Sequence, residues 1–566
     1  QQQNIDCGVV LAKYIPPQIK KTLPGIFLKT VVDAGSRPFA RWLRDKPKWE
    51  SLTWTEAGKT AQQLATILKT KHSVEPGDRV LVLCDSGPES VLLFYAIQLC
   101  GAAFVIREPR MAPSTVKMMA DMLEPKLIVT QPEHSSTYTY VGLDEDSGQP
   151  VTLTENNHAA NVSKWLSEGA TDAEAFPNLA KNGPASVIDA DVCWSEEVKK
   201  AKKLEDLSTE EQIGMMVTTS GTTGKPKAVM HGQKGMYYNA LGIYEFLDTP
   251  FGAMVLPFDQ GYISYTMVLH AQTRTGLCLH FVKRETLQSW FAEGWPKEVQ
   301  PRPTVVLLLA DSVGKLHKKM AEKIKHKGKF VNKILHRCIS SRMRALDRSH
   351  HAPNRVLKGV KGFHASLGNK LVAKKIRNAF GGKATTIVTG AAKCPEDAIE
   401  FFCGCGLRVM EGYASTEGFL STIVTSETFE KGSVGVPFVT KFEIDGTPVY
   451  KPNNEIKIAP STNAKEDGVI YLRGDSVFNG YYNLDEKTKE VMDDEGWFNT
   501  GDLGHWVTVP KNNHHDEFRA LKITGSDGRR FPLSLDGMPW VWPEQLEGYL
   551  LNAEILRDVC IVGTNQ

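Results

Sequence analysis

The sequence predicts an α/β protein with a largely parallel sheet, followed by a smaller β-rich part. Over the first 130 residues, short apolar runs typical of buried strands alternate with helical patterns. The same alternation returns at 215–221, 304–310 and 384–390. From about residue 420, the chain changes to shorter β runs separated by turn residues. These observations predict layers of helices and sheets, with a β-rich subdomain after them.

The first strand and helix of this alternation have the clearest patterns. The run RVLVLCDSG at 79–87 predicts a strand that ends at a glycine. The apolar run from Ser90 to Ile106 spans about 17 residues, contains Gln98 and is interrupted by Gly101. It is short for a bilayer span, so we expect a buried helix that ends at Gly101 and not a membrane span. The next predicted elements are the strand AAFVI at 102–106, a helix around Pro113–Leu123 and the strand KLIVT at 126–130.

Composition restricts the class of protein. Of the 566 residues, 41% are apolar and 23% are charged, which is typical of a globular protein and excludes disordered and fibrous ones. This length implies several domains. Ten Cys without the paired spacing of a zinc site indicate a reducing compartment. The chain opens with QQQNIDCGVV, in which no targeting peptide is visible; earlier removal of such a peptide and trimming of the chain both stay open.

Two segments differ from the rest in composition. Residues 133–190 are rich in Ser, Thr, Asn, Asp and Gly, which predicts a long surface insertion. Residues 311–383 contain 20 Lys and Arg but three acidic residues, against 47 and 62 in the rest of the chain. This basic segment predicts either a solvated helical face or contact with an anionic membrane surface, and the two rank equally. Nucleic acid ranks well below both, because no interleaved aromatics and no nucleic-acid motif accompany the charge.

The strongest local signal follows the β run GMMV. The string TTSGTTGKPK at 218–227 places hydroxyl side chains, two glycines and two lysines in one loop. A backbone that turns at Gly221 and Gly224 can aim several N–H groups at one anion, and Lys225 and Lys227 add positive charge for a polyphosphate. The string differs from the GxxxxGK[ST] loop, because no hydroxyl residue follows the lysine. On physical grounds, phosphate binding is favoured over a flexible surface turn.

This string resembles the signature loop of the AMP-forming adenylating superfamily, which comprises acyl-CoA synthetases, beetle luciferases and the adenylation domains of peptide synthetases. Three further motifs follow in that family's order. They are Gly390-Ala391-Ala392, which resembles the motif beside the acyl and adenine pockets, EGYASTE at 411–417, which resembles the adenine and magnesium motif, and GWFNTGD at 496–502, which is similar to the ribose motif. Arg473-Gly474 and Gly480-Tyr481 also stand where the family places them. The resemblance covers nearly the whole chain and is closest to long-chain fatty acyl-CoA synthetases.

The resemblance implies a role for each candidate residue. Thr416 contacts the phosphate and Glu417 binds Mg²⁺, and both are implied as catalytic together with Lys227. Tyr413 lies against the adenine, and Asp502 accepts hydrogen bonds from both ribose hydroxyls. Without the motifs, a core aromatic, a solvated helix start and a turn aspartate are the simpler interpretations. The other residues implied in nucleotide binding are Thr219, Ser220, Gly221, Thr222, Thr223, Gly224, Lys225, Gly390, Ala391 and Arg529.

The resemblance also implies a reaction. The carboxylate of a medium- to long-chain fatty acid attacks the α-phosphate of ATP, and the thiol of coenzyme A then displaces AMP, so ATP, Mg²⁺ and coenzyme A are expected. The acyl pocket is implied around Tyr237, at 256–265 and from Gly390 onward. No nucleophilic side chain is required, so Cys403 and Cys405 are expected to be structural.

The family architecture supplies the expected domains. They are an N-terminal AMP-binding domain at 1–519, with two sheet-and-helix subdomains and a β-rich subdomain at about 420–510, and part of a small α+β lid at 520–566. The expected location is intracellular, at the cytosolic face of a membrane or in mitochondria.

The last part of the chain departs from the family pattern. Only 64 residues follow Asp502, and the lysine that the family carries near its C-terminus has no counterpart. The hinge stretch at 521–531 leaves Asp527 as the candidate hinge carboxylate and Arg529 as a candidate ribose contact. Two hypotheses therefore stand beside the acyl-CoA ligase. One is a catalytically retired homologue that serves as a structural subunit of a larger assembly, and the other is an adenylating enzyme that passes the acyl group to a carrier-protein thiol or an amine.

Overall fold

The structure is a computed structural model of the whole chain. It describes residues 20–43, 48–107, 113–130, 138–143, 150–155, 158–169, 181, 185–219, 226–247, 250–257, 262–326, 328, 332–337, 339–340, 373–390, 394–424, 430, 432–444, 447–460, 467–510, 517–526, 531–532 and 540–541.

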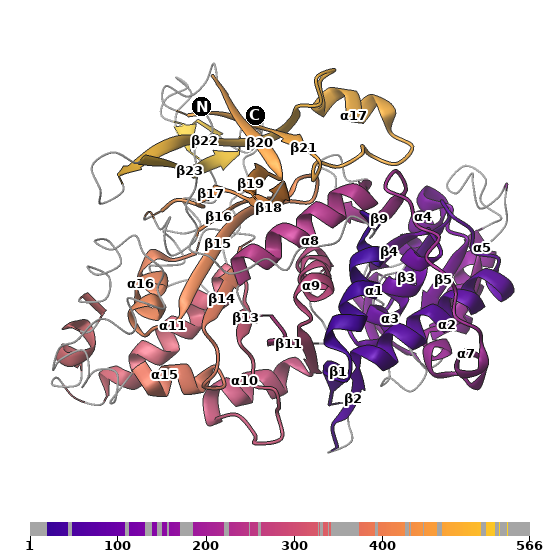
Figure 1. Cartoon of the computed structure of the whole chain (residues 1–566), viewed down its shortest axis with the longest axis horizontal. Coiled ribbons are helices and arrows are strands. Elements are labelled where there is room, and N and C mark those ends of the chain that lie inside the picture. Colours follow the sequence, from indigo (N-terminus) through magenta and orange to yellow (C-terminus); the bar gives the residue numbers. More distant parts are fainter. Residues whose placement is uncertain are drawn as a thin grey trace.

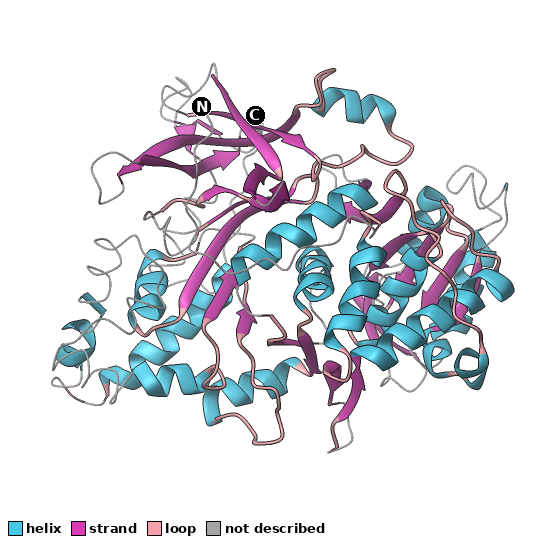
Figure 2. Cartoon of the chain, viewed as in Figure 1, coloured by secondary structure: helices cyan, strands magenta, loops and turns pink. Residues whose placement is uncertain are grey.

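The first sheet has helices on both faces (Figures 1 and 2). Its six strands run in the order β10 (Lys227–Gly232), β9 (Ile213–Thr219), β4 (Ala103–Arg107), β3 (Arg79–Leu83), β5 (Leu127–Thr130) and β8 (Ser186–Asp189). The covering helices are α2 (Trp54–His72), α3 (Pro88–Leu99), α4 (Pro113–Leu123) and α5 (His158–Gly169). All neighbouring strands are parallel except β10 with β9. Val80 and Val82 of β3 join the buried cluster of α2 and α3, whereas Leu81 and Leu83 join that of α4 and α5, as alternation along a strand requires.

The second sheet is larger and also has a parallel centre. Its nine strands run in the order β17 (Val436–Pro437), β16 (Phe419–Ile423), β15 (Arg408–Ser415), β14 (Thr386–Thr389), β13 (Val305–Leu307), β11 (Ala253–Pro257), β12 (Cys278–Val282), β1 (Pro38–Trp42) and β2 (Glu50–Thr53). The pairs from β15 to β1 are parallel, and the edge pairs are antiparallel. One face is covered by α11 (Ala310–Lys325), α15 (Lys374–Ala379) and α16 (Glu396–Gly404). Helix α10 (Arg284–Glu293) packs on Val255 and Val282.

The two sheets share one core. Helices α1 (Leu23–Ala34), α8 (Gln233–Leu247) and α9 (Tyr262–Thr275) contribute to a buried cluster that includes Phe104 of the first sheet and Met254 of the second. Because strands of both sheets and the helices beside them bury their side chains in one cluster, the two sheet-and-helix subdomains pack as a unit.

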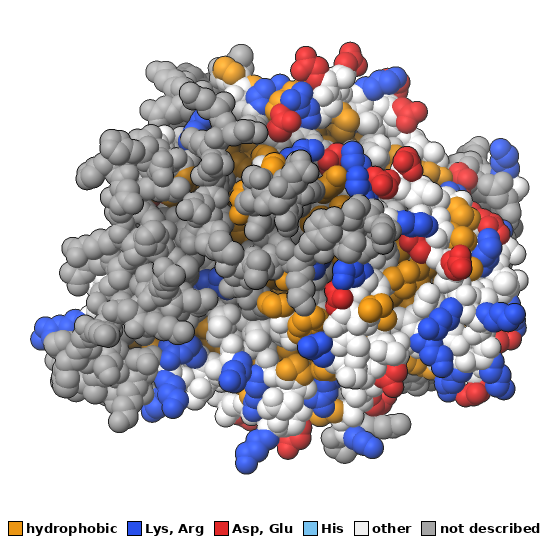
Figure 3. Space-filling view, viewed as in Figure 1, with side chains coloured by type: hydrophobic (Ala, Val, Ile, Leu, Met, Phe, Trp, Pro, Cys, Tyr) orange, Lys and Arg blue, Asp and Glu red, His pale blue; other side chains and the backbone are white. Residues whose placement is uncertain are grey.

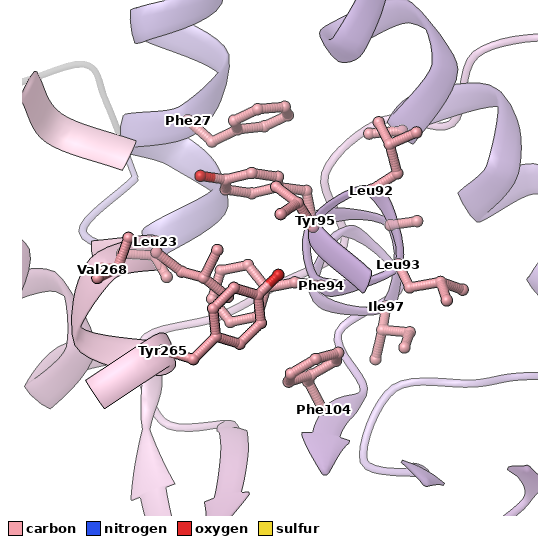
Figure 4. Packing of buried hydrophobic residues seen from close by; sticks show 14 of the residues in the cluster. Leu23, Phe27, Leu92, Leu93, Phe94, Tyr95, Ile97, Phe104, Tyr265 and Val268 are labelled. Atoms are coloured by element: carbon pink, nitrogen blue, oxygen red, sulfur yellow. The ribbon is translucent and has the colours of Figure 1, made fainter. Parts of the chain in front are cut away.

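Two buried tyrosine hydroxyls inside this core are paired. The Tyr95 ring stacks on Phe27 with 3.8 Å between centroids, as the nearly parallel rings in Figure 4 show. The Tyr95 hydroxyl lies 3.0 Å from Thr273 Oγ1, and the Tyr265 hydroxyl lies 2.8 Å from Ser90 Oγ. Buried hydroxyls that find partners remove the cost of desolvating them, so these two contacts tie α3 to α9.

A β-rich region follows the second sheet, as the sequence predicts. Its four-stranded antiparallel sheet consists of β20 (Asn454–Pro460), β21 (Gly468–Gly474), β22 (Phe498–Pro510) and β23 (Glu517–Ser526). The smaller elements beside it are β18 (Val439–Ile444), β19 (Thr447–Pro452) and α17 (Asp485–Val491), and β24 (Phe531–Pro532) pairs with β25 (Trp540–Val541). Residues 520–526 continue β23, whereas most of 527–566 lies outside the described residues, so the lid stays a prediction.

The predicted helix and strand after residue 88 are confirmed. Helix α3 begins where the Gly87 N–H donates to Ser90 Oγ at 2.9 Å, and it ends at Leu99. Gly101 adopts a φ of +73°, which a glycine tolerates at a helix end, and β4 follows. None of the helices in the described part of the chain combines the length and the apolarity needed to cross a bilayer.

The prediction of a long surface insertion at 133–190 is corrected. Strands β6 (Tyr138–Leu143) and β7 (Pro150–Glu155) form a hairpin, and β8 is an edge strand of the first sheet. Helix α5 buries Val162, Trp165 and Leu166 in the same cluster as α4. These apolar residues recur at helical spacing within a polar composition, and it was the composition that suggested a loop.

Candidate active site

The predicted phosphate loop connects two paired strands. β9 ends at Thr219 and β10 begins at Lys227, and these two residues are directly opposite each other in the antiparallel ladder. Both side chains are partly exposed. The buried Thr218 Oγ1, at the end of β9, has no hydrogen-bond partner in the described part of the chain. The residues between the strands, Ser220, Gly221, Thr222, Thr223, Gly224 and Lys225, lie outside the described residues.

A tight turn between β15 and β16 carries Thr416 and Glu417. The Gly418 N–H donates to Ser415 Oγ at 2.9 Å, and Asn454 Nδ2 donates to the Gly418 carbonyl at 2.7 Å. Phe419 closes the turn with a φ of +49°. The turn is therefore fixed from both sides, which holds its two candidate catalytic residues in one geometry.

The Glu417 carboxylate is held by the segment between β21 and α17. Tyr481 donates its hydroxyl proton to Glu417 Oε1 at 2.9 Å, and the Phe478 N–H donates to the Glu417 carbonyl at 2.7 Å. Burial raises the pKa of Glu417, and the Tyr481 hydrogen bond and the charge of Lys227 oppose that rise. Lys227 Nζ lies 4.6 Å from the centroid of the Tyr481 ring. One tyrosine thus contacts both candidate charges.

The candidate adenine and ribose residues contact each other. The Tyr413 hydroxyl of β15 donates to Asp502 Oδ2 of β22 at 2.6 Å. Burial, followed by the neighbouring Asp502 charge, raises the pKa of Tyr413 well above its usual value. The charges of Asp502 and Glu417 also influence each other, which places the two carboxylates in one site.

Gly390 lies at the end of β14, beside the strand that carries Tyr413. A Cβ at this position would lie 3.4 Å from the carbonyl oxygen of Gly412, the residue before Tyr413, which is an ordinary van der Waals contact. Gly390 therefore lies next to the backbone that carries Tyr413, whereas Ala391 lies outside the described residues.

His231, which the sequence did not single out, connects the phosphate-loop strand to the catalytic turn. Its Nε2 donates to the Thr416 carbonyl at 2.7 Å, and its ring stacks on Phe419 with 3.9 Å between centroids. Burial lowers the pKa of His231 to about 4, so the ring is neutral near pH 7. A hydrogen bond between segments this far apart in sequence leaves no local pattern. Tyr481 stands where the family motifs place it, but the sequence does not show that it contacts Glu417 and Lys227.

The structure thus brings together Lys227, Thr416, Glu417, Tyr413 and Asp502, with Thr219 and Gly390 at the edges. They come from three distant parts of the chain and meet where β10, β15 and the β20 to β23 sheet approach each other (Figure 1). Arg529 lies outside the described residues, so its proposed ribose contact stays a prediction.

The Glu417 carboxylate fits a cation that is bound mainly by the phosphates of a substrate and only partly by the protein. Within the described ranges, no group of three or more His, Cys, Asp or Glu side chains is arranged to hold a metal ion. Mg²⁺ typically uses one or two carboxylates together with substrate phosphates and water. A single partly buried carboxylate near a lysine matches that mode of binding better than it matches a preformed metal centre.

The cysteines at 403 and 405 and the tyrosines expected near the acyl pocket lie in the buried parts of the protein. Cys405 is buried. Cys403 is half-buried, and burial raises the pKa of its thiol to about 11, so it is not suited to act as a thiolate. Tyr237 and Tyr265 are both buried in the shared core. Residues 258–261 lie outside the described residues, so the acyl pocket stays a prediction.

Comparisons with known proteins identify relatives of the whole chain. The chain is 30% identical over 393 residues to the protein named long-chain-fatty-acid–CoA ligase 5 of Mus musculus, an alignment that covers 67% of this chain and 50% of that protein. It is 22% identical over 580 residues to long-chain-fatty-acid–CoA ligase 6 of Rattus norvegicus, covering 99% of this chain and 74% of that one. The first alignment therefore spans about half the length of the mouse relative.

A solved structure shares the fold. The crystal structure of ATP-bound MatB from Rhodopseudomonas palustris superposes with a TM-score of 0.62 at 15% identity, and covers 93% of this chain and 82% of that one. The family described as AMP-binding enzyme matches residues 31–482, which is most of the chain and includes the loop, the turn and Tyr481. The chain belongs to the AMP-binding enzyme family.

Proposed function

We propose that this chain activates a medium- to long-chain fatty acid with ATP, forming an acyl-adenylate and then an acyl-CoA. The observation that carries the proposal is that Lys227, Glu417, Tyr413 and Asp502 lie in one site. These residues belong to motifs that follow one another along the chain in the family's order. The names of the two mammalian relatives support a long-chain acid as the substrate.

The chemistry requires two anions to approach each other. A carboxylate oxygen forms a bond to the α-phosphorus as the bond to pyrophosphate breaks, and charge accumulates on the leaving group. Lys227 neutralises phosphate charge, and Thr416 fixes the phosphate position. Mg²⁺, when bound, adds positive charge to the phosphates, and the Glu417 carboxylate is the group that would hold it.

The nucleoside end of ATP is assigned to the other half of the site. The Tyr413 ring provides an apolar face for the adenine, and Asp502 accepts hydrogen bonds from the ribose. In the second step, the coenzyme A sulfur bonds to the acyl carbon, AMP leaves with the bonding electrons, and the thiol proton passes to solvent.

The test is acid-dependent exchange of pyrophosphate into ATP by the chain, with fatty acids from two to twenty carbons. We expect exchange with the longer acids and, when coenzyme A is added, an acyl-CoA product. Glu417→Gln should abolish exchange while the protein stays folded. The matched control is Glu490→Gln on α17, where the carboxylate pairs with Lys487 on an exposed helix.

Two outcomes would contradict the proposal. Absence of exchange with every acid, with ATP still bound, would favour a catalytically retired homologue. Exchange without an acyl-CoA product would favour transfer to another thiol or to an amine.

We also propose that the exposed face of α11 contacts an anionic membrane surface. Lys315, Lys318, Lys319, Lys323 and Lys325 are exposed on this helix. Its apolar residues, including Val313, Met320 and Ile324, are buried in the same cluster as α16. Figure 3 shows Lys and Arg side chains at the lower left, where Figure 1 places α11 and α15. Because the apolar face is already used, this contact would be electrostatic and would weaken with salt. It fits a location at the cytosolic face of a membrane.

A further inference from the structure

Tyr481 is the one side chain that the described structure places against both Lys227 and Glu417. The Lys227 ammonium lies over the ring face, 4.6 Å from the ring centroid. The Tyr481 hydroxyl donates a hydrogen bond of 2.9 Å to Glu417 Oε1. The two charges influence each other electrostatically, yet in the described structure they form no direct ion pair.

A direct pair between these charges would occupy the site. An ammonium and a carboxylate in contact neutralise each other, and a cation and a phosphate would then have to compete for them. The ring and hydroxyl of a tyrosine satisfy both groups without cancelling either charge. The ring face attracts the ammonium, and the hydroxyl donates a charge-assisted hydrogen bond to one carboxylate oxygen.

The backbone holds Tyr481 firmly in this position. Val229 and Tyr481 form a β-bridge, and the Tyr482 N–H donates to the Ala228 carbonyl at 2.9 Å. The Tyr481 N–H donates to Thr488 Oγ1 at 2.9 Å, and its ring packs on Phe478 with 4.9 Å between centroids. A side chain fixed in this way positions what it touches.

We propose that Tyr481 is a positioning residue that keeps Lys227 and Glu417 apart and orients each toward its own ligand, the lysine toward a phosphate and the carboxylate toward a divalent cation. This inference rests on the proposed function, because it assumes that the site receives ATP with Mg²⁺. It assigns two separable tasks to one side chain, the hydroxyl serving Glu417 and the ring serving Lys227.

These two tasks can be separated by measuring the equilibrium binding of ATP to the full chain. Binding is measured once with Mg²⁺ and once with a chelator instead of Mg²⁺, and no turnover is needed. Tyr481→Phe keeps the ring and removes the hydroxyl. We expect it to raise the Mg²⁺ concentration for half-maximal enhancement of ATP binding by about tenfold, and to leave binding in chelator unchanged. Tyr481→Met fills the space without an aromatic face. It should also weaken binding in chelator by about threefold.

The matched control is Tyr482→Phe. Tyr482 is the next residue, and its ring lies under the Arg79 guanidinium at 5.2 Å, away from both charges. This variant should bind ATP like the unsubstituted chain under both conditions. Combined with Glu417→Gln, Tyr481→Phe should add no further loss of Mg²⁺ enhancement, because the hydroxyl acts through that carboxylate. Circular dichroism confirms that each variant is folded.

The proposal is overturned if Tyr481→Phe leaves the Mg²⁺ dependence unchanged, if it weakens binding equally in Mg²⁺ and in chelator, or if its effect adds fully to that of Glu417→Gln. These readouts are distinct from the test of function. Unaltered Mg²⁺ dependence in an active ligase would refute the role of Tyr481 alone. The expected binding pattern in a chain without exchange activity would refute the ligase alone.

Discussion

Asp502 and Tyr413 lie 89 positions apart in the sequence, yet they share a hydrogen bond of 2.6 Å. The motifs identified both residues separately, one as a ribose ligand and one as an adenine partner. The tyrosine hydroxyl occupies one oxygen of the carboxylate that the ribose is predicted to use, so ribose binding must share or replace this hydrogen bond.

A sugar-selectivity measurement tests the role of Asp502. If its carboxylate accepts both ribose hydroxyls, pyrophosphate exchange should favour ATP over 2′-deoxy-ATP by about tenfold or more, since a hydrogen bond to a charged group contributes about 1.5–3 kcal/mol. Asp502→Asn should lose most of this preference while still binding adenine. Equal preference in both proteins would place the ribose elsewhere. Asp467→Asn, which removes the acid that pairs with His505 on the same sheet, is the control.

His270 gives the protein a predictable pH dependence. Burial, followed by repulsion from His231, lowers the pKa of His270 from 6.5 to about 3. Between these pH values, the unfolded chain binds a proton at this residue and the folded chain does not. The contribution of His270 to the free energy of unfolding is therefore fully present well above pH 6.5 and decreases as the pH falls toward 3. At pH 5 the loss from this residue is about 2 kcal/mol.

Urea unfolding at pH 7 and pH 5 measures this loss. His270→Gln carries no titratable group and should lose about 2 kcal/mol less than the unsubstituted chain between the two pH values. The exposed His336, changed to Gln, is the control and should behave like the unsubstituted chain. An identical loss in all three proteins would contradict the expectation.

Helix α11 shows how an element can serve two purposes. Its apolar side packs on α16 and completes the second sheet's outer layer, and its basic side faces away from the core. Sequence composition predicts the charge, but not which face the neighbouring helices would leave open. With the apolar side covered, insertion into lipid is unfavourable and only the charge is available to a membrane.

Changing Lys318, Lys319 and Lys323 to Gln should weaken binding to vesicles rich in anionic lipid. Each lysine near such a surface contributes about 1 kcal/mol, so the three changes together should lower the partition coefficient by about a hundredfold. Co-sedimentation at low and high salt measures this. Lys59, Lys200 and Lys203, which are exposed on the first subdomain, form the matched control set. If both triple variants bind like the unsubstituted chain, the α11 face is a solvated surface.

At the scale of the whole molecule, the site is assembled from parts that the core holds in place. β10 belongs to the first sheet, β15 to the second, and Tyr481 and Asp502 to the β-rich region. Hydrogen bonds from His231 to Thr416 and from Tyr481 to Glu417 join all three. A ligand bound here contacts every layer and should stabilise the described molecule as a unit.

Thermal unfolding with ATP and Mg²⁺ tests this assembly. At a ligand concentration of 100 times the dissociation constant, binding stabilises the folded state by about 2.7 kcal/mol, which should raise the unfolding midpoint by a few degrees. Glu417→Gln should remove the part of the shift that depends on Mg²⁺. A shift confined to a separate, lower transition would show that the β-rich region unfolds independently.

The sequence by itself determined the alternating strands and helices, the β-rich region and the four motifs, because these depend on local periodicity and on residue types that are close together in the chain. It identified Lys227, Glu417, Tyr413 and Asp502 through such motifs. The tertiary structure decided that α5 packs against α4, that α11 has a covered and an open face, that His231 belongs to the site, and that Tyr481 contacts both Lys227 and Glu417. These features depend on contacts between segments far apart in the chain. Which distant segments meet is determined by the packing of the shared core, and no local sequence pattern encodes that packing.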